Sequence, residues 1–328
     1  MDKLKAAVIG LGEMGQHHAR VYAQMEDVTL VAVCDSDETR LRNITRTWGG
    51  KPFTDYWAML VDQKPDVVSV AVPTSQHLEA GNASLVAGCH VLVEKPIAAT
   101  VKDAWLLIGT AIVEKRILAV GHIERCNPIV SATKAVIDAG DLGQIYRITT
   151  RRVGPSPKRI RDVGVTLDLA THDLDVMRYL IQSEPLFVQA ELQFQAHSGL
   201  DDGVAALVRF ENGVVGVLEC DWLSCAKDRR LTITGSLGVW EANYLTQTAM
   251  MRASPTSQAS FNVPQEEPLL VELRSFVAAV RGEGRPAATG EDGLRALEMA
   301  MAIVEGDRGC CVHSGAGGCS AGSCASGS

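Results

Sequence analysis

Apolar runs alternate with segments of helical spacing through the first part of the chain. The runs lie at residues 31–35, 67–72, 90–93 and 117–122. Between them, residues 78–87 carry apolar side chains at helical intervals. Strands that alternate with helices form parallel sheets with helices on both faces. The pattern therefore predicts a doubly wound α/β domain over residues 1–122.

The pattern changes after Pro128, where helices and short strands follow in a different order. Strands are predicted at residues 145–153, 187–196, 204–210, 214–221 and 231–234. Helices are predicted at residues 129–139, 166–181, 269–280 and 294–304. The sequence Glu211-Asn212-Gly213 between two of the strands is a strong hairpin signal. Residues 123–308 are therefore expected to form a second α/β domain with an open, mostly antiparallel sheet and helices on one face.

The other face of this second sheet would carry too much apolar surface for a monomer. We expect it to pair with another subunit, in a homodimer or homotetramer. Residues 309–328 are rich in Gly, Ser and Cys and are expected to be a disordered tail.

A glycine-rich turn follows the first strand. Gly10 permits a tight turn, Gly12 lets the backbone approach a pyrophosphate, and Gly15 lets the next helix pack on the strand. Asp35 ends the second strand twenty residues later, where its carboxylate can bind both ribose hydroxyls. A 2′-phosphate would be repelled there, so the motif predicts NAD in preference to NADP. The alternative is a structural turn that binds nothing.

Composition narrows the class of protein. The chain has 328 residues, 46% hydrophobic, with a net charge of −8 and a pI near 5.5. Such a charge argues against general binding to nucleic acid or to anionic membranes. No apolar run reaches the ~20 residues that cross a bilayer, and the N-terminus does not resemble a signal peptide, so a cytoplasmic location is expected.

The nine cysteines fall into two groups. Those among apolar segments are expected to be small buried residues in a reducing compartment: Cys34, Cys89, Cys126, Cys220 and Cys225. The tail holds Cys310, Cys311, Cys319 and Cys324 beside His313. Their spacing matches no zinc pattern, so no metal site is predicted, and the alternative to a disordered extension is a metal or redox site in the tail.

Two places carry candidate chemistry. Lys95 follows a buried strand and precedes Pro96, which restricts it to extended geometry. Ligands of such sheets lie in a crevice beyond the carboxyl ends of the strands, so the ammonium could polarise an oxygen at the nicotinamide end of this crevice. Asp168 and His172 are four residues apart on a predicted helix, where the carboxylate could orient an imidazole that removes a hydroxyl proton. The alternatives are an exposed lysine and a surface ion pair, since Asp173 and Asp175 give the same helix further acids to solvate.

The glycine motif with His18-Ala19-Arg20, followed by Glu94-Lys95-Pro96 and by Asp168 and His172, resembles the Gfo/Idh/MocA oxidoreductases over nearly the whole chain. The resemblance implies a Rossmann domain followed by an α/β domain with an open antiparallel sheet. It also implies that Lys95 and His172 flank the reacting carbinol, with His172 as the base and Asp168 positioning both.

The same resemblance assigns the contacts to NAD. Glycine-turn residues would hold the pyrophosphate: Gly10, Gly12, Glu13 and Met14. Asp35 and Arg40 would lie near the adenosine. Residues toward the nicotinamide would be Thr74, His77, Glu94 and Lys95.

A cluster of cations precedes the candidate catalytic helix. Within eleven residues, and without an acid among them, lie Arg151, Arg152, Lys158, Arg159 and Arg161. On a loop, this cluster would be an anion trap suited to a diphosphate, which favours a nucleotide-linked sugar over a neutral polyol. The alternative is a solvated loop or an oligomer contact.

Residues 121–128 and 154–164 resemble a nucleotide-sugar 3-dehydrogenase branch of the family, although Cys126 replaces an expected phenylalanine. This branch oxidises UDP-N-acetylglucosamine, or its uronic acid, at C3 and supplies an aminotransferase that uses pyridoxal phosphate. Glu124, Asn127, Arg152, Arg161 and His172 would then contact the sugar nucleotide. A neutral-sugar or inositol dehydrogenase is the next enzyme reading. An NAD-sensing regulator is a distant one, since no DNA-binding pattern is visible.

Overall fold

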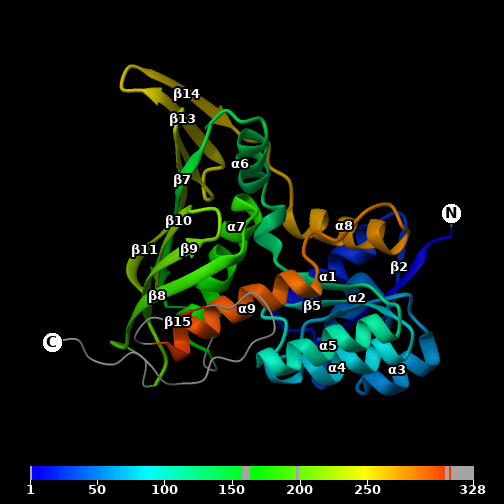
Figure 1. Cartoon of the computed structure of the whole chain (residues 1–328). Coiled ribbons are helices and arrows are strands. Elements are labelled where there is room, and N and C mark those ends of the chain that lie inside the picture. Colours follow the sequence, from blue (N-terminus) through cyan, green and yellow to red (C-terminus); the bar gives the residue numbers. More distant parts are fainter. Residues whose placement is uncertain (1, 157–162, 197–198, 307–309, 312–328) are drawn as a thin grey trace.

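The structure is a computed structural model that describes residues 2–156, 163–196, 199–306 and 310–311. Two sheets lie side by side and are joined through helices (Figure 1). No helix in the described part of the chain is long and apolar enough to span a membrane.

The first sheet is parallel and has the strand order β3-β2-β1-β4-β5-β6. Its strands are β1 (Leu4–Ile9), β2 (Val28–Cys34), β3 (Lys51–Phe53), β4 (Val67–Val70), β5 (His90–Glu94) and β6 (Leu118–Gly121). Every residue of β4 is buried, as expected of a strand covered on both faces. This order is that of the doubly wound Rossmann fold, which confirms the predicted architecture.

Helices cover both faces of this sheet. One face packs against α1 (Glu13–Gln24), α2 (Glu38–Trp48) and α8 (Pro268–Val280). The other packs against α3 (Tyr56–Gln63), α4 (His77–Val86), α5 (Val101–Val113) and α9 (Gly290–Glu305). The two predicted closing helices therefore return to the first sheet, and α9 continues onto the second.

The second sheet has the strand order β14-β13-β12-β11-β7-β10-β9-β8-β15 and is antiparallel except for the β7 and β10 pair. Its strands are β7 (Ile145–Pro155), β8 (Pro185–Gln193), β9 (Gly203–Phe210), β10 (Val215–Asp221), β11 (Leu223–Gly235), β12 (Gly238–Asn243), β13 (Thr248–Ser254), β14 (Ser257–Asn262) and β15 (Cys310–Cys311). Within the described residues only one face is covered, by α6 (Pro128–Asp138), α7 (Thr171–Ile181) and α9 (Figure 1). The predicted open sheet with helices on one face is confirmed.

Three expectations need correction. The strands β12, β13 and β14 were not expected, because their residues are of mixed polarity and those of β14 are all exposed. Cys310 and Cys311 pair with β8, so the tail begins with a short strand, and its other cysteines lie outside the described residues. Four of the cysteines expected to be buried are so, but Cys225 is exposed on β11.

Candidate active site between the two sheets

The glycine turn has the geometry that its sequence requires. Gly10 has a φ of +88°, and a side chain there would meet the Ala71 backbone. A Cβ on Gly15 would lie 1.8 Å from the Gly10 carbonyl oxygen, so only glycine lets α1 pack this closely. A Cβ on Gly12, by contrast, has nothing within 4 Å, which leaves open space before the first turn of α1. That space fits a pyrophosphate at a helix N-terminus.

Asp35 is fixed beside this turn. One carboxylate oxygen accepts the Leu11 N–H at 2.6 Å and the other accepts the Asp37 N–H at 2.8 Å. Arg40 lies 3.6 Å from both Asp35 and Asp37 and remains largely exposed. A carboxylate held at the end of β2 suits the ribose hydroxyls of NAD.

A hollow next to the glycine turn brings together most of the residues expected near the nicotinamide. It is lined by Met14, Thr74, His77, Glu94, Lys95 and Asp168, with apolar neighbours. The ring of His77 is buried, and its two nitrogens lie 2.9 and 3.0 Å from the carbonyl oxygens of Pro96 and Val72. Its contact to protein backbone shows that His77 holds the two loops together.

Glu94 belongs to a buried chain of hydrogen bonds below the hollow. His18 Nε2 lies 2.8 Å from Glu94, His18 Nδ1 lies 3.0 Å from Ser69, and Ser69 lies 2.9 Å from the Tyr22 hydroxyl. Burial alone would raise the pKa of Glu94, but the hydrogen bond and charge of His18 and the charge of Lys95 lower it. Glu94 therefore stays ionised beside Lys95.

Lys95 and Asp168 meet across the two sheets. The ammonium donates to the Asp168 carbonyl oxygen at 2.7 Å and to its carboxylate at 3.2 Å. Lys95 directly follows β5, whereas Asp168 lies in a π-helical turn, Thr166–Ala170, that leads into α7. This contact fixes the lysine at the edge of the hollow, beside Asp168.

The expected contact between Asp168 and His172 is not formed. No hydrogen bond or ion pair joins these two described residues, and Asp168 is bonded to Lys95 instead. Nδ1 of His172 is buried and has no hydrogen-bond partner among the described residues. Burial, followed by the charges of Lys95 and Arg152, lowers the pKa of His172 well below its usual value. The imidazole is thus neutral at neutral pH, the form that can accept a proton.

The cation cluster does not form one loop. Arg151 and Arg152 lie in β7, so their side chains point to opposite faces of the sheet. Arg152 bonds both carboxylate oxygens of Asp173 at 3.1 Å and Glu124 at 2.7 Å. Lys158, Arg159 and Arg161 lie outside the described residues. The expected trap is therefore wrong for its first two members, whose charges are already neutralised.

Asp173 and Asp175 are not solvated acids either. Both are buried, and Asp175 forms a two-bond pair with Arg125 at 2.6 and 2.8 Å. Burial alone would lower the pKa of Arg152, yet Asp173 and Glu124 raise it well above the usual value. These pairs anchor α7 to β7 and to the segment after β6.

The two expected sugar contacts have protein partners. Glu124 accepts from Arg152 and, at 2.9 Å, from the Asn127 amide. The Asn127 oxygen accepts the Ile129 N–H at the start of α6 and the Gln247 amide at 2.9 Å. In this structure Glu124 and Asn127 therefore serve as a buried carboxylate partner and a helix cap.

A second hollow adjoins the first at Asp168. It is lined by Glu13, Arg152, Val153, Gly154, Pro155, Asp168, Leu169, Asp221, Trp222, Lys227 and Arg229. Lys227 forms no ion pair with any described residue, and Arg229 lies 3.9 Å from Glu124. Sequence reasoning missed both, because they reach the hollow only through the pairing of β11 with β7, which sets Arg229 opposite Arg152. The run Lys227 to Arg230 was the available signal.

His122 is a further polar group that the site residues did not include. It follows β6, is 2% exposed, and neither ring nitrogen has a hydrogen-bond partner in the described part of the chain. Its Nδ1 lies 3.8 Å from Asp175, and burial lowers its pKa.

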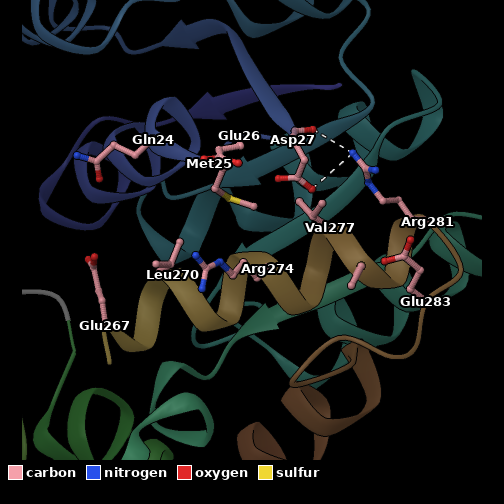
Figure 2. A pocket seen from close by; sticks show the side chains of 11 residues that line it. Gln24, Met25, Glu26, Asp27, Glu267, Leu270, Arg274, Val277, Arg281 and Glu283 are labelled. Atoms are coloured by element: carbon pink, nitrogen blue, oxygen red, sulfur yellow. Dashed lines mark hydrogen bonds and ion pairs between the residues drawn. The ribbon is translucent and has the colours of Figure 1, made fainter. Parts of the chain in front are cut away.

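Another hollow lies away from this crevice, between α8 and the end of α1 (Figure 2). Across one end of it, Arg281 donates to the carbonyl oxygen of Asp27 at 3.0 Å and lies 3.5 Å from its carboxylate, as Figure 2 shows. Its polar walls include Glu26, Glu267 and Glu283. None of the predicted site residues lines it. No cluster that could hold a metal occurs among the described residues.

Comparison with known proteins agrees with this geometry. Residues 4–122 match the Gfo/Idh/MocA oxidoreductase family with an NAD-binding Rossmann fold, and residues 130–241 match the C-terminal domain of that family. Together the two matches span most of the chain.

Individual relatives cover almost the full length. The chain is 27% identical to the UDP-N-acetylglucosamine 3-dehydrogenase of Acidithiobacillus ferrooxidans, over 92% of this chain and 97% of that one. A solved structure of that enzyme superposes with a TM-score of 0.86, over 93% of this chain and 98% of that one. The myo-inositol 2-dehydrogenase of Thermotoga maritima is 28% identical, over 91% and 95%. The chain therefore belongs to the Gfo/Idh/MocA family and is an NAD-dependent oxidoreductase.

Proposed function

We propose that the protein oxidises the C3 hydroxyl of UDP-N-acetylglucosamine to a ketone. NAD, when bound, accepts the hydrogen of C3 with its electron pair. Gly10, Gly12, Glu13 and Met14 would hold its pyrophosphate, with Asp35 and Arg40 at the adenosine. The proposal rests on the crevice between the sheets and on the full-length relative that acts on this substrate.

Lys95, which lines the crevice, and His172, which lines neither hollow but feels the charge of Lys95, divide the proton chemistry. The neutral imidazole of His172 accepts the proton of the C3 hydroxyl, since its lowered pKa leaves it unprotonated. The ammonium of Lys95 donates a hydrogen bond to the same oxygen and stabilises the negative charge that develops there. Asp168 positions Lys95 through the contact already described.

The observation that carries the substrate class is the pair of cations in the second hollow. Lys227 and Arg229 line it from β11, next to Asp168. Three other charged groups of its wall are engaged by protein: Arg152 with Asp173, Asp168 with Lys95, and Asp221 with the N–H groups of Leu223 and Ser224. Glu13, the remaining charged group of the wall, is a predicted contact of the NAD pyrophosphate. Two cations without a strong acidic partner suit the oxygens of a diphosphate. Arg161 stays a predicted contact on the same substrate.

A second candidate is an inositol or neutral-sugar dehydrogenase, because a myo-inositol 2-dehydrogenase is as similar to the chain. That substrate would leave Lys227 and Arg229 without a ligand. The uronic acid of UDP-N-acetylglucosamine differs only by a carboxylate, which would need a further cation.

Absorbance of reduced nicotinamide distinguishes these candidates. The purified protein is given NAD and one of four substrates: UDP-N-acetylglucosamine, its uronic acid, UDP-glucose or myo-inositol. A pyridoxal-phosphate aminotransferase with glutamate removes the ketone, because oxidation of an isolated hydroxyl is uphill. Turnover is expected with UDP-N-acetylglucosamine, and turnover only with myo-inositol would overturn the proposal.

Lys227→Ala tests the diphosphate contact within the same assay. We expect a raised KM for the nucleotide sugar and an unchanged Kd for NAD, because Lys227 does not line the first hollow, where the nicotinamide is expected. Arg230→Ala is the matched control, since Arg230 is a largely exposed cation of the same strand, paired with Asp228. Equal effects of the two substitutions would remove the support for a diphosphate.

The reaction would place the protein before an aminotransferase that makes a 3-amino sugar, as in the synthesis of lipid A. The open face of the second sheet would pair with another copy, because it exposes apolar residues such as Leu207 beside Ala205.

A further inference from the structure

The π-helical turn that carries Asp168 is capped from another part of the chain. Val165, its N-cap residue, makes no side-chain hydrogen bond to the turn. Asp201, in the loop directly before β9, takes this role. One oxygen of its carboxylate accepts the N–H of Thr166 at 2.8 Å and the Thr166 hydroxyl at 2.6 Å. The carbonyl oxygen of Asp201 accepts the Val165 N–H at 2.9 Å, so one residue binds two successive N–H groups at the start of this helical segment.

The approach of Asp201 to the turn depends on a glycine. A Cβ on Gly164 would lie 1.7 Å from the other carboxylate oxygen of Asp201 and 3.0 Å from its backbone nitrogen. Asp201 is 7% exposed, and Thr166 is completely buried. A buried carboxylate needs hydrogen-bond donors, and here the turn supplies them.

Thr166 connects this anchor to the rest of the turn. Its carbonyl oxygen accepts the Thr171 N–H, which is the bond to the fifth residue that defines a π-helical turn. The Asp168 N–H donates to the Gly164 carbonyl oxygen at 3.0 Å. The backbone of Asp168 is therefore placed by two residues, Gly164 and Thr166, that both lie against Asp201.

Lys95 depends on the backbone of this turn. Its ammonium donates to the Asp168 carbonyl oxygen at 2.7 Å, a shorter contact than the 3.2 Å to the carboxylate. A carboxylate can rotate to follow the ammonium, whereas a carbonyl oxygen moves only with its peptide plane. A displacement of the turn should therefore displace the ammonium of Lys95.

We propose that Asp201 is a positioning residue for Lys95, which it fixes through the π-helical turn and the Asp168 carbonyl. Asp201 lines neither hollow, so it acts only through the turn. Its effect on the reaction rests on the role proposed above for Lys95. A misplacement of about 1 Å at a reacting group can lower a rate about 10²-fold.

Acetylation of Lys95, followed by mass spectrometry, tests the positioning without using activity. Lys102, which is exposed on α5, is the internal reference. Asp201→Ala removes the acceptor for Thr166, and we expect Lys95 to be labelled about threefold faster or more, relative to Lys102. Asp201→Asn keeps an acceptor oxygen and should restore the original rate.

The matched control is Asp202→Ala. The neighbouring Asp202 is also buried, and its carboxylate accepts the N–H groups of Gln195 and Ala196, beyond the end of β8. Its loss should leave the labelling of Lys95 unchanged. Unchanged labelling in Asp201→Ala, or labelling raised equally in Asp202→Ala, would overturn the proposal.

Turnover measures the consequence for the reaction, with whichever substrate is active in the assay described above. Asp201→Ala should lower kcat about tenfold or more with an unchanged Kd for NAD, while Asp201→Asn and Asp202→Ala stay close to the unmodified protein. Faster labelling of Lys95 with an unchanged kcat would support the positioning and would contradict instead the role proposed for Lys95 in the reaction.

Thr166→Val tests the same contact if thermal unfolding shows that Asp201→Ala does not fold. This change removes only the hydroxyl donor to Asp201, whereas Thr166→Ser keeps it. We expect faster labelling of Lys95 in Thr166→Val and the original rate in Thr166→Ser. Equal labelling in these two variants would overturn the proposal.

Discussion

Neighbouring arginines of β7 give two opposite predictions from one residue type. Arg152 is 2% exposed and is held between Asp173 and Glu124, which are both buried. Arg151 points to the other face, is 38% exposed, and pairs with Glu219 and Asp228. We predict that Arg152→Met destabilises the protein strongly, whereas Arg151→Met has little effect.

The magnitude follows from burial. Removal of one partner from a buried ion pair costs about 3–5 kcal/mol, since the remaining charge stays buried without compensation. Arg152→Met leaves two such carboxylates. An exposed pair contributes at most about 1 kcal/mol. For a domain of this size, each kcal/mol lowers Tm by about 2–4 °C, so Arg152→Met should lose roughly 10 °C or more.

Acidification should reduce the difference in stability between Arg152→Met and the unmodified protein. Arg152 lowers the pKa of Glu124 against the effect of burial. The ion pair therefore stabilises the folded protein fully above the pKa that a glutamate has in the unfolded chain. This contribution is lost as the pH falls through the lower pKa of Glu124 in the folded protein. In Arg152→Met the buried carboxylate has lost this partner and takes up a proton at higher pH. The deficit in stability should therefore be smaller at pH 5 than at pH 8.

Thermal and urea unfolding at these two pH values measure both variants against the unmodified protein. Equal stability of the two variants would refute the reasoning. A raised KM for the nucleotide sugar in Arg152→Met with unchanged Tm would instead restore Arg152 as a substrate contact.

Further predictions concern the two hollows. Gly12→Val should weaken NAD binding at least tenfold by titration while Tm is unchanged, because its side chain enters open space; an unchanged Kd would contradict this. Asp35→Ser should lower the preference for NAD over NADP, which the ratio of the two kcat/KM values measures, and an unaltered ratio would argue against the ribose contact. The kcat/KM of the unmodified protein should stay on its plateau as the pH falls through 6.5, since the pKa of His172 is lowered. Lys95→Met should reduce kcat by 10² or more and move this acid limb to higher pH, because a positive neighbour of His172 is lost; a limb that does not move would separate the two residues.

The sequence predicted those parts of the fold that depend on local patterns. The alternation of short apolar runs with helical spacing was sufficient for the first sheet, and Gly10, Gly15 and Asp35 indicated the turn because each has a specific steric or polar requirement. Lys95 and Asp168 could be named from their motifs. Their contact depends on how the two sheets pack, which neither motif contains.

Contacts between elements far apart in the sequence limited the prediction of the site residues. Arg151 and Arg152 were grouped with the loop cations, although both lie in the strand predicted at residues 145–153, where neighbouring side chains point to opposite faces. The alternative of a surface ion pair treated Asp173 and Asp175 as solvated acids, because their partners, Arg152 and Arg125, lie on other elements. Lys227 and Arg229 were missed for the same reason, since β11 brings them to the hollow from far along the chain.

Transfer of deuterium from labelled substrate tests the central claim most directly. UDP-N-acetylglucosamine carrying deuterium at C3 is incubated with the protein and NAD, and the reduced nicotinamide is analysed by mass spectrometry. We predict one deuterium in the reduced nicotinamide, with formation at least 10²-fold slower in both Lys95→Met and His172→Asn. Reduced nicotinamide without the label, or formed at an unchanged rate by both variants, would contradict an oxidation at C3 in which Lys95 and His172 act together.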